Sequence, residues 1–333
     1  KMEHYWWQAI EDFKAAGMPQ DADEHDYFDY DIREIGIDTS FQLPHKVVQE
    51  TDEYTISTTS WGNTERYWKH AQTTPELIGF ACDTPDKWKD QYKHLKQPNS
   101  SRFDLEKIKN QYDEYRKQGR FVCYSVLEAF EATWRCCGPE IQLESLALDP
   151  DWMLDMYKSD TDLVIWGFEE LWAAGIEFDG MWLWGDVAYK NGPMISPRMY
   201  RELLMPFHKQ LCDLAHSKGA KVIYHGCGNN NQLMPLFIEA GIDCLQPLEV
   251  KAGMDVRELK AQYGDVMSFM GNIDARLFQT NDLAALEQEI KDKINIAKAG
   301  GGYIFHSDHS IPPGTTLETY QFAMELVEKY GRY

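Results

Sequence analysis

The chain has 333 residues, of which 43% are hydrophobic and 13% aromatic. This is too much core-forming material for a disordered or fibrous protein, and the length allows two domains or one large α/β barrel with added elements. The 54 acidic and 33 basic residues leave a net charge of −21. This charge repels phosphate backbones and anionic membrane surfaces, so we expect neither a nucleic-acid partner nor membrane binding.

Cysteine content and hydropathy indicate a cytoplasmic protein. The apolar runs are too short to cross a membrane, and no basic and apolar leader is expected at the start of the chain. The seven cysteines are odd in number and form no CxxC pair, which suits a reducing compartment where thiols stay free or bind metal. Nothing in the composition indicates an oligomeric state.

The first part of the chain lacks a regular alternation of helices and strands. Apolar spacing predicts a helix at Tyr5–Ala16, and two β-branched and aromatic runs, Glu53–Thr59 and Thr64–Trp68, predict a hairpin. A charged surface helix is expected within Pro85–Pro98. We interpret residues 1–110 as a helical and β-hairpin extension that packs on the main domain and is not an independent domain.

From about residue 119, short apolar runs alternate with amphipathic segments of helix length. This pattern is typical of parallel strands joined by crossover helices, and it predicts a (β/α)8 TIM barrel with residues 111–333 as its main part. A doubly wound sheet is the alternative, but the glycine-rich phosphate-binding turn that would follow its first strand is missing. The expected strands are Phe121–Leu127, Gly180–Trp184, Lys221–His225, Cys244–Leu248, Val266–Gly271 and Tyr303–His306.

Polar residues follow nearly every predicted strand, at the barrel end where reactive groups gather. An Asp or Asn at a strand end also commonly caps the next helix, so Asn272 and Asp274 suit a cap as well as a site. Asp186 precedes no immediate helix and lies in an aromatic setting, which favours a substrate contact or a proton carrier. Glu249 is either an ion-pair partner of Lys251 or an inward carboxylate.

The segment His225-Gly-Cys227-Gly is the sharpest local motif. Residues i and i+2 of a strand project to one face, so this imidazole and this thiolate, both zinc donors, can lean toward one ion. A buried histidine beside a buried free cysteine is the common structural alternative. A third donor from the last strand would favour the metal, and both Asp308 and His309 are candidates.

Several motifs together resemble the uroporphyrinogen decarboxylase superfamily, whose members are single TIM barrels and include decarboxylases and corrinoid-linked methyltransferases. The resemblance extends from about residue 30 to residue 330. It rests on six segments, which are Trp184–Gly192, Ile195–Tyr200, His225–Asn229, Pro247–Gly253, Met270–Asp274 and His306–Gly314.

In the methyltransferase branch, the HxC strand end and a cysteine near the final proline-rich turn bind a zinc ion, which holds the thiol that accepts a methyl group. The resemblance therefore implies a Zn²⁺ site at His225, Cys227 and His309, where histidine replaces the family's cysteine. An acidic residue is the alternative third ligand. Asp186, Glu249 and Asp308 are then the expected catalytic residues, which orient the substrate or the ligands.

The decarboxylase branch grips its substrate with an amino-terminal Arg-rich motif and an Asp loop, and residues 1–110 contain neither. The leading hypothesis is a zinc-dependent methyltransferase that moves a methyl group between a small methylated substrate or thiol and the cobalt of a corrinoid, carried by a partner protein. One alternative is a metal-free decarboxylase or lyase in which Asp186 and His309 carry protons. Another is a barrel that binds a corrinoid or tetrapyrrole without catalysis.

Overall fold

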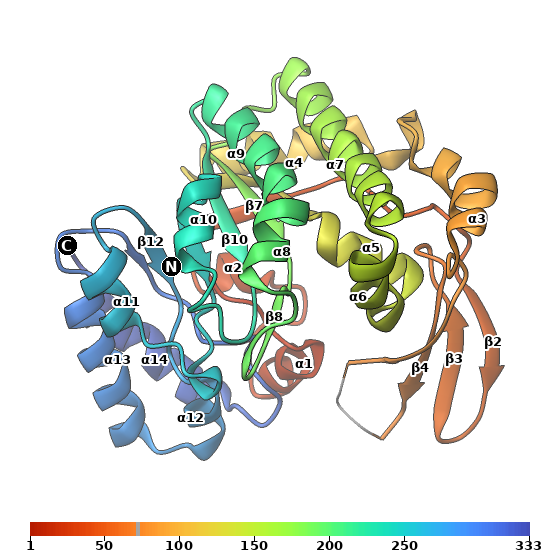
Figure 1. Cartoon of the computed structure of the whole chain (residues 1–333). Coiled ribbons are helices and arrows are strands. Elements are labelled where there is room, and N and C mark those ends of the chain that lie inside the picture. Colours follow the sequence, from red (N-terminus) through yellow and green to blue (C-terminus); the bar gives the residue numbers. More distant parts are fainter. Residues whose placement is uncertain (71–73) are drawn as a thin grey trace.

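The computed structural model describes residues 1–70 and 74–333. Its centre is a curled sheet of seven parallel strands in chain order (Figure 1). These strands are β1 (Ile32–Ile35), β6 (Phe121–Leu127), β7 (Gly180–Trp184), β10 (Lys221–His225), β11 (Cys244–Gln246), β12 (Ser268–Met270) and β13 (Tyr303–Ile304). Consecutive parallel strands with helices outside them make a TIM-barrel-like fold, which confirms the predicted fold class.

The first residues of the chain lie between the two edge strands of this sheet. The amide of Met2 donates to the carbonyl of Phe305 (3.1 Å), and the amide of Asp31 donates to the carbonyl of Lys1 (2.9 Å). The segment 1–5 thus takes the place of an eighth strand between β13 and β1. Because this segment is extended, helix α1 begins at Trp7 and not at the predicted Tyr5.

Helices surround the sheet and connect its successive strands (Figure 1). The longer ones are α1 (Trp7–Ala15), α4 (Leu105–Lys117), α5 (Ala129–Cys137), α6 (Pro139–Leu148), α7 (Pro150–Ala173), α9 (Met205–Ser217), α10 (Met234–Ala240), α11 (Val256–Tyr263), α13 (Leu283–Ala297) and α14 (Leu317–Tyr330). Shorter helices are α2 (Glu24–Tyr27), α3 (Pro85–Lys87), α8 (Pro197–Met199) and α12 (Ala275–Thr280).

Strands β6, β7 and β10 have the predicted bounds, whereas the later strands are shorter than predicted. Strand β11 ends at Gln246 because Pro247 has no amide hydrogen with which to continue the ladder. The boundary placed near residue 110 stays a prediction. The barrel sheet nevertheless takes β1 from the earlier part of the chain, through its pairing with β6.

A second, antiparallel sheet is built from residues that lie between β1 and β6 in the chain. Its order is β2 (Lys46–Glu50), β3 (Tyr54–Thr58), β4 (Asn63–Trp68) and β5 (Glu76–Phe80). The predicted hairpin is β3 with β4 and is confirmed by their register, in which Ile56 pairs with Arg66. Strand β2 was not predicted, because its five residues are all exposed and show no apolar alternation.

The region after this sheet is helical at residues 85–96, where a charged surface helix was predicted within 85–98, but it is not one continuous α-helix. Helix α3 is followed by a π-helical turn (Trp88–Tyr92) and a 3-10 turn (Lys93–Lys96), and both Trp88 and Lys96 are buried. The Lys96 ammonium pairs with Asp160 of α7 at 2.5 Å and donates to the Thr39 carbonyl at 2.7 Å. These contacts fasten one face of the region to α7, whereas its other residues are exposed or half-buried, as expected for a surface segment.

Helix α4 returns the chain from this region to β6, and it provides a stability test. Its N-cap residue Asp104 accepts a hydrogen bond from the Lys107 amide at 3.0 Å. We expect Asp104→Ala to lower the free energy of unfolding by about 1 kcal/mol, since one amide of the first turn loses its partner. Asp113→Ala, an exposed change on the same helix, is the matched control in urea denaturation. Equal urea midpoints for Asp104→Ala and Asp113→Ala would show that the Asp104 cap does not stabilise the protein.

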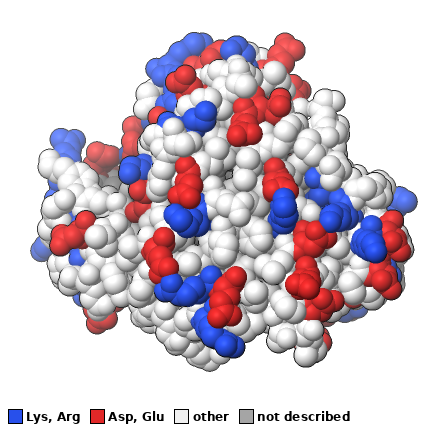
Figure 2. All heavy atoms as spheres, turned by 45° about the horizontal axis from the view of Figure 1, so that its top comes forward, with Lys and Arg blue, Asp and Glu red and all other residues white. Residues whose placement is uncertain are grey.

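Within residues 1–70 and 74–333, no helix has both the length and the apolar character that crossing a bilayer requires. Figure 2 shows Lys and Arg side chains interspersed with Asp and Glu on the face that it draws. On this face neither sign of charge forms one continuous patch.

Candidate metal centre

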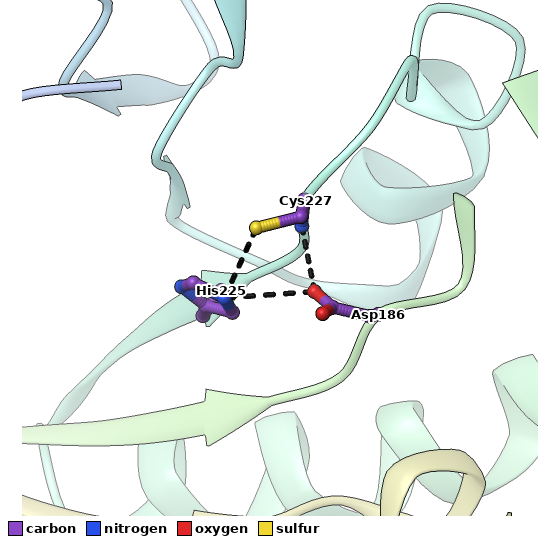
Figure 3. A group of neighbouring side chains, drawn as sticks. All are labelled: Asp186, His225 and Cys227. Carbon is purple, nitrogen blue, oxygen red and sulfur yellow. Dashed lines mark hydrogen bonds and ion pairs between the residues drawn. The ribbon is translucent and has the colours of Figure 1, made fainter. Parts of the chain in front are cut away.

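His225 and Cys227 converge at the carboxyl end of β10. The Sγ atom of Cys227 lies 3.6 Å from Nε2 of His225 (Figure 3), so the predicted sharing of one face is confirmed. The next residue, Gly228, has a φ of +84°, and a Cβ atom there would lie 2.7 Å from the backbone of Ala188 and Tyr189. Glycine is required at this turn, because it lets the chain after Cys227 pass close to that backbone.

Asp186 joins these two side chains from the loop after β7. Its Oδ1 atom accepts a hydrogen bond from the Cys227 amide at 2.7 Å and lies 3.5 Å from Nε2 of His225 (Figure 3). One ligand atom from each of the three residues lies within 4.8 Å of the others. Nitrogen, sulfur and carboxylate oxygen are all zinc donors, and three protein ligands leave one position open in a catalytic site. The donor set fits a catalytic zinc ion.

Gln246, at the end of β11, fixes which nitrogen of His225 carries the proton. Nδ1 of His306 donates to the Ser307 carbonyl (2.7 Å), so Nε2 of His306 is an acceptor and takes a hydrogen bond from Nε2 of Gln246 (3.2 Å). The Oε1 atom of Gln246 consequently faces Nδ1 of His225 at 2.5 Å, and that nitrogen must donate. This leaves the lone pair of His225 Nε2 directed at Cys227 and Asp186, as a metal ligand requires.

Burial sets the charge of the two main donors. Burial lowers the pKa of His225, although Asp186 opposes this, so the imidazole stays neutral near pH 7. Burial raises the pKa of the Cys227 thiol, and the negative charges of Asp186 and Glu249 raise it further. The thiol therefore keeps its proton until a cation lies beside it, and metal binding releases that proton.

The other predicted ligand, His309, lies outside this group of three. Its ring stacks on Trp6, with 6.3 Å between the ring centroids and 12° between the planes. The structure brings Asp186 to the donor pair instead. A metal contact of His309 stays a prediction from the family resemblance.

Glu249 and Asp308 both bind backbone amides. Glu249 accepts from the Gly228 amide at 2.7 Å and pairs with Lys251 at 3.0 Å, so it is an inward carboxylate and an ion-pair partner at once. Asp308 is 3% exposed, and its two oxygens accept from the amides of Ala275 (2.7 Å) and Val250 (2.9 Å). In this geometry Glu249 holds the loop that carries Cys227, and Asp308 holds two neighbouring loops.

The two residues for which a cap was the alternative have structural roles. Asp274 is the N-cap of α12 and accepts a hydrogen bond from the Arg276 amide. The amide group of Asn272 is buried and bonds the backbone of Leu248, Met254 and Val256. Both residues position the loops at this end of the barrel.

Residues 181–330 match the family described as Uroporphyrinogen decarboxylase (URO-D). Over this part the chain is similar to the uroporphyrinogen decarboxylase superfamily. A uroporphyrinogen decarboxylase of Trichlorobacter lovleyi is 26% identical over 145 residues, which cover 42% of this chain and 40% of that protein. One of a Nocardioides species is 29% identical over 144 residues, which cover 41% and 38%. The chain thus matches about two fifths of the length of these curated relatives.

A solved structure has the same fold over most of the chain. It is a methyltransferase from Methanosarcina mazei, with a TM-score of 0.61 and 14% identity, and the alignment covers 92% of this chain and 83% of that one. At this identity the likeness concerns the fold. The resemblance to the superfamily that the motifs predicted is confirmed.

A set of polar side chains that were not predicted as site residues lines the barrel interior next to His225. Gln246 is hydrogen-bonded to His306, and His306 to His4 at 3.0 Å. His4 is hydrogen-bonded to Glu34 at 2.9 Å. Ser125 donates to Glu34 at 2.5 Å and accepts from the Trp184 indole at 2.8 Å. The centroid of the Trp184 ring lies 4.4 Å from that of His225, so the last side chain of this series also contacts His225. The signal that the sequence offered was a serine within the apolar run 121–127, and a glutamate beside an arginine in the run 32–35.

Proposed function

We propose that the protein is a zinc-dependent methyltransferase that moves a methyl group between a small substrate or thiol and the cobalt of a corrinoid on a partner protein. The observation that carries this proposal is the convergence of His225 Nε2, Cys227 Sγ and Asp186 Oδ1 at the carboxyl ends of β7 and β10. The similarity of residues 181–330 to the uroporphyrinogen decarboxylase superfamily supports it.

Each residue of the site has a separate task in this proposal. A zinc ion, when bound, supplies the positive charge that lowers the pKa of a substrate thiol or assists a leaving oxygen. His225, Cys227 and Asp186 hold the ion, with His309 as the alternative to Asp186. Gln246 orients the imidazole, and Glu249 fixes the Cys227 loop through the Gly228 amide. At 40% exposure, the Asp186 side chain is also open to a substrate.

The test combines metal analysis with a methyl-transfer assay. We expect the purified protein to contain one zinc ion per chain. We also expect it to demethylate methylcob(III)alamin in the presence of a small thiol, as followed by the visible spectrum of the cobalt. Removing the zinc with a chelator abolishes the reaction, and adding zinc back restores it. A protein that takes up no zinc from a buffered zinc solution contradicts the proposal.

A second candidate function is metal-free decarboxylation, which the names of the matched relatives favour. Asp186 and His309 would then move protons to and from a small acid. Release of CO₂ from a small carboxylic acid that persists after chelation would identify this function. Binding of a corrinoid without either reaction would identify the third candidate, a non-catalytic barrel.

A further inference from the structure

A pocket of about 240 Å³ lies beside the metal centre and is unused by the ligands described above. Its apolar walls are Phe130 and Trp134 of α5, Leu143 of α6, and Met194. Asp186 also lines it, and the same carboxylate belongs to the donor group of the metal centre. A molecule in this pocket is therefore next to the metal site.

The polar side chains that line the pocket offer hydrogen-bond acceptors. Gln142 is 1% exposed, and its Nε2 atom donates to the Phe130 carbonyl (3.2 Å) and to the Tyr157 hydroxyl (2.7 Å). Its Oε1 atom has no partner within the described part of the chain. Because that atom is fully shielded, the acceptor that a ligand in the pocket reaches is the carboxylate of Asp186, whose side chain is 40% exposed.

The charges around the pocket disfavour an anion. Among the residues that the structure describes, no Lys or Arg lines it. Arg135, next to Trp134 in the chain, pairs with Glu131 at 2.7 Å and lies 4.9 Å from the centroid of the Trp134 ring. Its charge is thus neutralised locally. A carboxylate or sulfonate in the pocket would meet apolar walls and the carboxylate of Asp186 without a free cation.

We propose that this pocket binds the body of the substrate, and that the substrate is a small neutral molecule with an apolar, ring-sized body and one hydrogen-bond donor. This inference rests on the proposed function, because Asp186 places the pocket beside the reacting group. Typical ligand pockets have volumes of about 300–1,000 Å³, so this one suits about one six-membered ring with a short substituent. Burial of the ring against the aromatic walls gives affinity, and the Asp186 carboxylate accepts from the donor.

Calorimetric titration of the zinc-containing protein with four probes of similar size tests the proposed chemical class of the substrate. We expect benzyl alcohol to bind more tightly than toluene, which lacks the donor, and more tightly than benzoate, which is an anion. It should also exceed benzylammonium, because a bound zinc ion neutralises Asp186. Tighter binding of benzoate or benzylammonium overturns the proposed class.

Filling the pocket tests the location. Leu143→Trp is expected to weaken the binding of benzyl alcohol at least about tenfold, because the indole occupies the space of the probe. Leu148→Trp is the matched control on the same helix, at a position that is 83% exposed, and Met194→Trp is a second filling variant. Unchanged binding in both filling variants overturns the location. Probe binding requires no methyl transfer, so its failure is distinct from a failure of the zinc and demethylation measurements.

Discussion

Replacing Cys227 with alanine is expected to reduce the zinc content of the purified protein from one ion per chain to background. The thiolate is the strongest zinc donor of the group, and two remaining donors with an open face do not retain zinc through purification. His225→Ala should have the same effect, because it removes the nitrogen that lies 3.6 Å from that sulfur. Demethylation of methylcob(III)alamin is lost in parallel.

The control for this prediction is Cys212→Ala, which removes a buried cysteine of α9 and leaves the metal centre intact. It should keep its zinc. A Cys227→Ala protein that still carries one zinc ion per chain would remove the ligand assignment. Comparison of Asp186→Asn with His309→Ala then identifies the third ligand, since the variant that loses more zinc affinity has lost a ligand. The geometry favours Asp186.

The barrel could be predicted because its strands are read from local composition. Strands β6, β7 and β10 are continuous apolar runs, as expected for strands buried on both faces. Strand β1 was missed, because half of its four residues are charged. Its Arg33 is buried only because the carbonyls of Tyr30 and Ile32 and the carboxylate of Asp26 accept its hydrogen bonds. Such compensation comes from tertiary structure.

In the site, too, local spacing could be predicted from the sequence and tertiary contacts could not. Convergence of His225 and Cys227 follows from a spacing of two residues on one strand, which the sequence displays directly. Asp186 was predicted as catalytic, but its contact with the Cys227 amide joins two loops 41 residues apart. The contact of His4 with His306 spans 302 residues and depends on the amino-terminal segment that lies between the barrel edges. Periodicity carries no information about either contact.

Replacing Gln246 with leucine is expected to weaken zinc binding by about 10- to 100-fold, although Gln246 would not touch the metal. Partners that orient a metal-binding histidine have effects of this size. Without Oε1, Nδ1 of His225 loses the acceptor that lies 2.5 Å away, and the proton is free to move to Nε2, where it blocks the lone pair. Competition with a chelator of known affinity measures the loss.

Two further measurements separate this orienting role from a general loss of stability. Nitrogen NMR of the metal-free protein should show His225 protonated at Nδ1 in the wild type and as a mixture of tautomers in Gln246→Leu. Gln246→Glu keeps an acceptor facing Nδ1 and should retain most of the zinc affinity. Gln232→Leu makes the same change at an exposed position and should alter neither property. If Gln246→Leu keeps both its affinity and the Nδ1 signal, Gln246 does not position His225, whatever the zinc content of the wild type.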